Sequence, residues 1–300
     1  MVKPKNFAEE ATLWLSRGKT KDTHAFVSEL LKKRLAKPAL VLTQEDLRAR
    51  VLKTSKPAYV LGRQAYTTGR NWFGGLPLLP DHIPWPRTTR HQQPMHFWAQ
   101  IDCSTLSGPH DLPEKGLLLF FYDLDAFGTD GKDNGLGKVI FVPAEEIPSD
   151  ERMAPTDLPI FSHTPGEQTS DYGEGTVKAK FAAVPFEFAS YDLENVDLNW
   201  DRLTHENEFD ARKIACEMTH TNRKKTIAEK APETYGQHAL LGPEQQIKNP
   251  SGGEGVRLMC LGSDIEMGWE FGDVGVVEFW IAPSDLCHRR FDKAYAMVGY

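Results

Sequence analysis

Hydrophobic residues along this chain gather in short runs, and polar segments that contain glycine separate the runs. One pair of runs, 256–261 and 274–281, flanks an acidic segment at 263–273. An earlier pair, 95–102 and 116–123, has the same form. Short apolar runs between turn residues predict β-strands. The pattern therefore predicts two β-rich halves, each built around a pair of strands.

The two predicted halves, 56–143 and 232–300, share landmarks that occur in the same order. Three residues of the first half match three of the second: Gly75 with Gly242, Asp102 with Asp264, and Gly116 with Gly275. Landmarks that repeat at one long period are expected from an internal duplication. We therefore predict a duplicated β unit, with a linker and a helix joining its halves.

Helical periodicity is confined to two parts of the chain. Apolar residues recur at helical spacing within 5–53, where Thr43 opens a capping box, and again within 200–229. Residues 1–55 are therefore predicted to form a helical N-terminal cap. Residues 56–300 are predicted to form an α+β domain with a mostly antiparallel sheet.

Proline and glycine support three local predictions. Pro185 lies in the apolar run 181–188 and cannot donate to a ladder, so this run is predicted to be an edge strand. No G-K-[S/T] motif follows Gly74 and Gly75, so the pair predicts a turn with positive φ rather than a phosphate-binding loop. The acidic stretch 144–176, rich in proline, is predicted to be the surface linker.

Charge and composition argue against several classes of partner. The 300 residues include 35 basic and 42 acidic side chains, a net charge of −7, so nucleic acid is not an expected partner. The chain has no run of about eighteen apolar residues and no signal-peptide core, so we expect no membrane span and a cytoplasmic location. The four cysteines lack C-x-x-C spacing, and the stretch after Asp123 departs from a calcium loop, so no metal and no cofactor are expected.

Several motifs together resemble a known family. They are Gly74-Gly-Leu-Pro77 with Trp85-Pro86, Phe97-Trp-Ala-Gln-Ile-Asp102, Leu112-Pro-Glu-Lys-Gly-Leu-Leu-Leu-Phe120, Phe121-Tyr-Asp123, His238 with Leu241-Gly242, and Gly268-Trp-Glu-Phe-Gly-Asp273-Val-Gly275. In this order they resemble the YwqG-like family of bacterial proteins of unknown function, over residues 57–300. The chain departs from that family at Leu261-Gly-Ser-Asp264, where a glutamine usually precedes the second acidic turn. The resemblance implies a mixed α and β domain without an assigned activity. Because members are sometimes found near toxin systems, it also implies an immunity-like binding role.

The acidic segment of the second half is the centre of the candidate site. Asp264 and Asp273 bracket a glycine-bearing turn with Trp269 between them. Asp102 would face this turn if the halves pack about a pseudo-twofold axis. The candidate ligand-binding residues are Asp102, Asp264, Trp269, Asp273, Trp98 and His238. Two interpretations stay open, because the carboxylates could hold a ligand or could cap turns by accepting backbone N–H bonds.

Two functions are compatible with these residues. The first is a non-catalytic binding protein, because tryptophans near acidic turns suit ligand binding and an acidic surface suits another protein with a basic surface. The second is a hydrolase that pairs Asp264 and Asp273 with Asp102 or with a histidine. The sequence contains no nucleophile elbow, zinc signature or phosphate loop, so we predict the binding protein.

Overall fold

The computed structural model describes residues 42–65, 69–89, 91–123, 135–158, 180–191, 205–232, 238–242, 255–269 and 275–299. The chain divides into two units, 1–55 with 191–220 and 56–190 with 221–300. The helices that the sequence predicts before residue 42 lie outside the described residues.

The first unit contains the helix α3 (Gln44–Leu52), which begins at the predicted capping box. The Thr43 hydroxyl accepts a hydrogen bond from the N–H of Asp46 at 3.1 Å, and the Asp46 carboxylate accepts one from the N–H of Thr43 at 3.0 Å. These bonds satisfy two backbone donors at the start of the helix. Leu47 and Val51 are the buried residues of α3.

The helix α5 (His205–Lys230) begins in the first unit and ends in the second. It confirms the helix predicted at 200–229. In the first unit, the side-chain amide of Gln44 donates to Asp210 at 2.6 Å and so joins α3 to α5. In the described part of the chain, no helix combines the length and the apolar character needed to cross a membrane.

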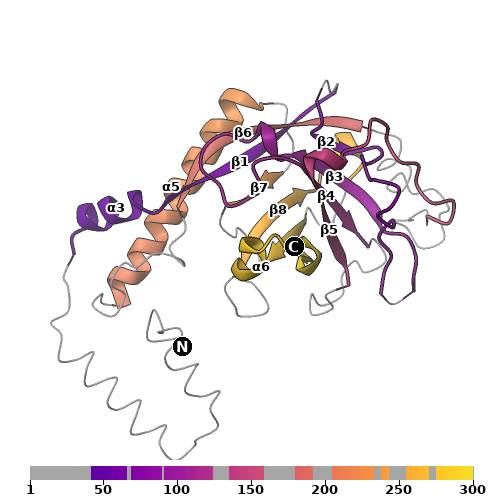
Figure 1. The fold of residues 1–300 in the computed structure, drawn as a ribbon. Coiled ribbons are helices and arrows are strands. Elements are labelled where there is room, and N and C mark those ends of the chain that lie inside the picture. The colour runs from indigo at the N-terminus through magenta and orange to yellow at the C-terminus, as the bar shows by residue number, and fades with distance from the viewer. Residues whose placement is uncertain are drawn as a thin grey trace, which may run out of the picture. The chain divides into compact units, whose positions relative to one another are not determined.

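The described strands form one ten-stranded sheet in the order β10-β9-β8-β7-β1-β6-β2-β3-β4-β5 (Figure 1). Their bounds are β1 Ser55–Gln64, β2 Trp72–Gly74, β3 His96–Asp102, β4 Leu117–Tyr122, β5 Gly137–Val142, β6 Lys180–Tyr191, β7 Ala239–Leu240, β8 Val256–Gly262, β9 Val276–Ile281 and β10 Tyr295–Gly299. The ladders β2–β3–β4–β5 and β7–β8–β9–β10 and the pairs β1–β7 and β2–β6 are antiparallel. The mostly antiparallel sheet of the predicted α+β class is therefore confirmed.

The two edges of the sheet approach each other, so the sheet nearly closes into a barrel. Gly137 of β5 is so near Ala296 of β10 that a Cβ on the glycine would overlap the Cβ of the alanine. Short helices connect the strands or follow them: η1 Cys103–Thr105, η3 Ala144–Glu146, η5 Ile265–Met267, α6 Pro283–Cys287 and η6 Phe291–Lys293. At the barrel edge, the rings of Phe141 and Phe291 pack with their centroids 5.6 Å apart.

The hairpins β3–β4 and β8–β9 have matching registers. Each pairs a seven-residue strand with a six-residue strand, and the register shifts around the third residue, Trp98 in β3 and Leu258 in β8. The short strands β2 and β7 pair with the same positions of these hairpins. They are also followed by similar turns, because φ is 61° and 64° at Gly74 and Gly75 and 58° and 91° at Leu241 and Gly242. The predicted positive-φ turn at Gly74-Gly75 is confirmed.

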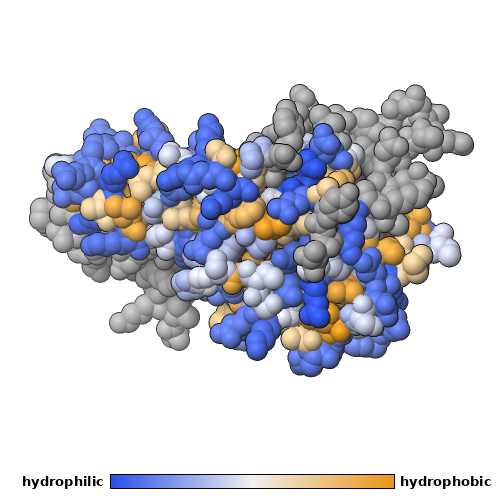
Figure 2. Space-filling model, turned by 90° about the horizontal axis from the view of Figure 1, so that it is seen from above, coloured by the Kyte–Doolittle hydropathy of each residue, from blue (hydrophilic) through white to orange (hydrophobic). Residues whose placement is uncertain are grey.

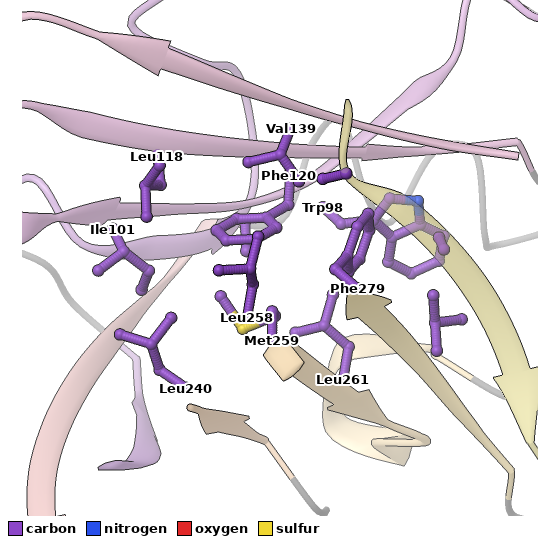
Figure 3. Close-up of a cluster of buried hydrophobic side chains, with 14 of the residues drawn as sticks. Trp98, Ile101, Leu118, Phe120, Val139, Leu240, Leu258, Met259, Leu261 and Phe279 are labelled. Carbon is purple, nitrogen blue, oxygen red and sulfur yellow. The ribbon is translucent and has the colours of Figure 1, made fainter. Parts of the chain in front are cut away.

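The inner faces of both halves form one apolar core. Figure 3 shows side chains of β3, β4 and β5 pointing toward those of β7, β8 and β9. Among them, Phe120 and Phe279 pack edge to face with centroids 5.2 Å apart. Both are fully buried, together with Leu118, Leu258 and Leu261. Apolar burial across the barrel, roughly 1.5–3 kcal/mol for each large side chain, therefore holds the halves together.

One local prediction is wrong: the run around Pro185 is not an edge strand. It lies in β6, which has β1 on one side and β2 on the other. β2 is only three residues long and pairs with residues 180–182 of β6, so Pro185 lies beyond the part of β6 that β2 reaches. The missing N–H of the proline therefore removes no bond to β2.

The beginning of the predicted linker covers the outer face of the first half. Arg152 donates to the backbone oxygens of Pro80, at 3.1 Å, and Ile83. Ile147 and Ala154 pack against the apolar cluster on this face. The rest of the linker, from residue 159, lies outside the described residues up to β6.

Candidate functional site

Asp264 begins the turn that follows β8. One carboxylate oxygen, Oδ1, accepts hydrogen bonds from the N–H of Glu266 at 3.0 Å and of Met267 at 3.4 Å, so it caps η5. The backbone of Asp264 exchanges two further bonds with Trp269, of 2.7 and 2.9 Å. Gly268 lies inside this loop with φ 68°, a conformation that favours glycine. Asp264, the first of the two acids predicted for this turn, therefore holds the turn together through its backbone and its carboxylate.

The other carboxylate oxygen of Asp264, Oδ2, meets two side chains from other strands. Arg63, on β1, places Nε 3.1 Å from it, and His238, directly before β7, places Nε2 at 3.2 Å. The second ring nitrogen of His238, Nδ1, accepts from the N–H of Gly262 at 3.3 Å. Because Nδ1 is an acceptor, the ring proton lies on Nε2 and is donated to Asp264.

Aromatic side chains surround this polar cluster. The ring of Phe73 lies 4.8 Å from that of His238, and the ring of Trp269 lies 5.8 Å from it. Trp98 packs against Trp269 with centroids 4.7 Å apart. The side chains of His238 and Asp264 are completely buried. The structure thus brings together four predicted site residues: Trp98, His238, Asp264 and Trp269.

The two remaining predicted residues are not part of this cluster as described. The Asp102 carboxylate caps η1, where Oδ1 accepts from the N–H of Ser104 at 3.0 Å and from its hydroxyl at 2.6 Å. Asp273 lies outside the described residues. Arg63, which the sequence analysis did not select, is the additional member. The sequence did contain a signal for Arg63: side chains alternate between the two faces of a strand, and Tyr59 and Leu61 of β1 face the core, so Arg63 is expected on the same face.

Burial and hydrogen bonding set the charges of the cluster. Burial lowers the pKa of His238, against the opposing effect of its bond to Asp264, so the imidazole is neutral. Burial acts to raise the pKa of Asp264, but its hydrogen bond to His238 and the positive charge of Arg63 lower that pKa overall. The cluster therefore contains a carboxylate paired with a guanidinium and bonded to a neutral histidine.

This arrangement leaves little capacity for proton transfer to a substrate. Each carboxylate oxygen of Asp264 accepts two hydrogen bonds, and both ring nitrogens of His238 are bonded within the protein. A general base needs a free position within hydrogen-bond reach of the proton that it removes. The cluster instead joins β1, the start of β7 and the end of β8. Within the described stretches, no group of three or more His, Cys, Asp or Glu residues is placed to hold a metal ion.

Comparison with known protein families gives one finding. A family model described as a domain of unknown function, DUF1963, matches residues 72–298, about three quarters of the chain. The match includes both hairpins and the Asp264 turn, but neither α3 nor β1. No curated protein matches the chain.

Proposed function

The chain belongs to the DUF1963 family, and from its geometry we propose that it is a non-catalytic binding protein. The observation that supports this proposal is the saturated state of the Asp264 cluster. A buried polar network in which every group has a partner specifies and rigidifies a core. Asp264 and His238 therefore serve the fold, and binding takes place elsewhere on the chain.

The hydrolase alternative gains no support from the described residues. It requires Asp264 to act with Asp102 or with a histidine, yet Asp102 bonds to Ser104 and His238 is bonded at both nitrogens. Its other acid, Asp273, lies outside the described residues. The hydrolase therefore remains the alternative function, which an activity assay would have to establish.

The proposed partner is another protein with a basic surface. The net charge of −7 favours a basic partner through long-range attraction. The face in Figure 2 is mostly hydrophilic, with separate small hydrophobic patches. A polar face of this kind suits an electrostatically steered contact without a cofactor. The immunity-like role and the cytoplasmic location that the sequence suggests are part of this proposal.

We further propose that the sheet consists of two duplicated halves of a YwqG-like domain, preceded by a helical cap at 1–55. The matched registers of β3–β4 and β8–β9 support the duplication. The paired turns at Gly75 and Gly242 support it as well. The halves also pair directly, because β1 of the first half pairs with the short strand β7 of the second, while β6, in the connection between the halves, pairs with β2.

A capture experiment tests the binding proposal. The purified full chain is immobilised and exposed to cell lysate at low and at high salt, and each captured protein is then purified and titrated against the chain by calorimetry. We expect a basic partner whose affinity falls as salt is added, because exposed charges are screened. A set of captured proteins that all fail to bind when purified, or that bind independently of salt, would contradict the proposal.

A further inference from the structure

The outer face of β8 and β9 contains a second buried polar cluster. Arg257 lies opposite Trp280 in the ladder, and Cys260 lies opposite Glu278. Val276, on the same face of β9, packs with Cys260. All these side chains are nearly or fully buried, with Glu278 at 0% and Trp280 at 4% exposure. The cluster is separate from the Asp264 site and has no role in the proposed protein contact.

The ion pair in this cluster is incompletely bonded. Arg257 Nη1 donates to Glu278 Oε1 at 2.8 Å, and Nη2 reaches the backbone oxygen of Leu241 at 3.4 Å. Within the described residues, three buried polar atoms of this face have no hydrogen-bond partner: Arg257 Nε, Glu278 Oε2 and Trp280 Nε1. Buried polar atoms without partners are rare in native proteins, and three on one patch require an explanation.

The fold itself does not need charged residues at these positions. In the matching hairpin of the first half, Phe97 corresponds to Arg257, Leu119 to Glu278 and Phe121 to Trp280. There the outer face is an apolar cluster. Replacing a buried ion pair by packed apolar residues is often neutral or stabilising. The second half therefore keeps its charges at a cost in stability, which is typical of a functional position.

We propose that this face binds a small ligand through a primary carboxamide group. The site offers two N–H donors, Arg257 Nε and Trp280 Nε1, and one acceptor, Glu278 Oε2. A carboxamide oxygen accepts two hydrogen bonds and its NH₂ donates, so one such group has the hydrogen-bonding capacity that these three atoms need. Arg257 and Glu278 already pair with each other, so the bound group needs no charge of its own.

Other ligand groups fit this site less well. A carboxylate has no hydrogen for Glu278 Oε2, and its charge is repelled there. An ammonium group has no acceptor for the two N–H donors, and it would lie near the guanidinium of Arg223, whose charge acts on Arg257 and Cys260. Burial raises the pKa of Cys260 to about 11, so the neighbouring thiol stays protonated and the ligand is held without a covalent bond.

Saturation-transfer NMR with acetamide and propanamide tests this proposal on the full-length chain, with acetate and propanoate as matched probes. We expect the amides to bind and the carboxylates not to bind. Trp280→Phe removes only one donor and should weaken amide binding roughly two- to tenfold. Trp85→Phe is the control, because Trp85 is similarly buried but its indole N–H already donates to Met95.

A second variant tests the donor and acceptor pattern. Glu278→Gln replaces the acceptor by a donor, so the folded variant should lose its preference for amides over carboxylates. Equal or absent binding of amides and carboxylates by the wild type would overturn the proposal. A crystal structure that shows a single water molecule bonded to the three atoms in the presence of acetamide would also overturn it. Loss of amide binding in Trp85→Phe would place the probe elsewhere and have the same consequence.

Discussion

At the scale of single residues, Asp264 is the acid on which the second half depends. Replacing it with Asn keeps one oxygen for the N–H of Glu266 but leaves the Arg63 charge without its carboxylate. We predict that Asp264→Asn lowers the free energy of unfolding by roughly 3 kcal/mol, measured by urea denaturation.

Asp102→Asn is the matched control, since Asp102 also caps a short helix and, among the described residues, its carboxylate bonds to the neutral Ser104 rather than to a buried charged side chain. Its cost should stay near the capping value of about 0.5–2 kcal/mol. Equal losses in the two variants would show that the cluster around Asp264 adds nothing beyond a cap.

His238 gives a prediction about pH. Burial places its folded pKa below the unfolded value, so the unfolded chain takes up the proton first as pH falls. The stability contribution is complete above about pH 6.5 and declines below it. His238→Gln keeps a donor toward Asp264 but does not titrate. Between about pH 6.5 and 5, its stability should fall less steeply than that of the wild type, by up to about 1.4 kcal/mol per pH unit. Identical slopes would mean that His238 is not held neutral.

Sequence reasoning predicted part of this cluster. Capping was one of the two interpretations left open for the acids of the turn, and Asp264 does cap η5. Asp102 was expected to face that turn, and it caps η1. Tryptophans near the turn were expected to gather there, and Trp98 and Trp269 do so. The bond from Arg63 could not be predicted, because 201 positions separate it from Asp264 and only the pairing of β1 brings them together.

At the scale of elements, the closure of β5 against β10 is sensitive to a single methyl group. A Cβ at Gly137 would overlap Ala296, so Gly137→Ala should lower the free energy of unfolding by roughly 1–3 kcal/mol. Adding Ala296→Gly makes room again, and the double variant should recover part of the loss in a urea titration. A neutral Gly137→Ala, or a double variant whose losses simply add, would show that the edges do not meet there.

Local patterns predicted most single elements but not their order in the sheet. The strand runs at 95–102, 116–123 and 256–261 were visible because apolar runs and turn residues alternate along the sequence. The short strand β10 was not predicted, and β6 was assigned to an edge. The position of β6 depends on which strands pair with it: it lies inside the sheet because it pairs with β1 and β2. A local sequence pattern contains no information about such pairing.

At the scale of the whole chain, we propose that Asp264 and Asp102 stabilise the fold and that the chain functions by binding. The matched hairpins share an inner core but differ on their outer faces, one apolar and one charged. Such divergence between similar halves is where a binding function can arise without loss of the fold. The DUF1963 match covers both hairpins, so this difference lies inside the family domain.

The proposal that Asp264 stabilises the fold and takes no part in catalysis is tested most directly by the rates of ester and phosphate hydrolysis by the wild type and by Asp264→Asn. Both proteins are assayed with p-nitrophenyl acetate and p-nitrophenyl phosphate, and each rate is divided by the folded fraction found by circular dichroism. We predict equal rates that do not exceed buffer with heat-unfolded protein. A wild-type rate about tenfold or more above that of the folded variant would contradict the account and assign Asp264 to catalysis.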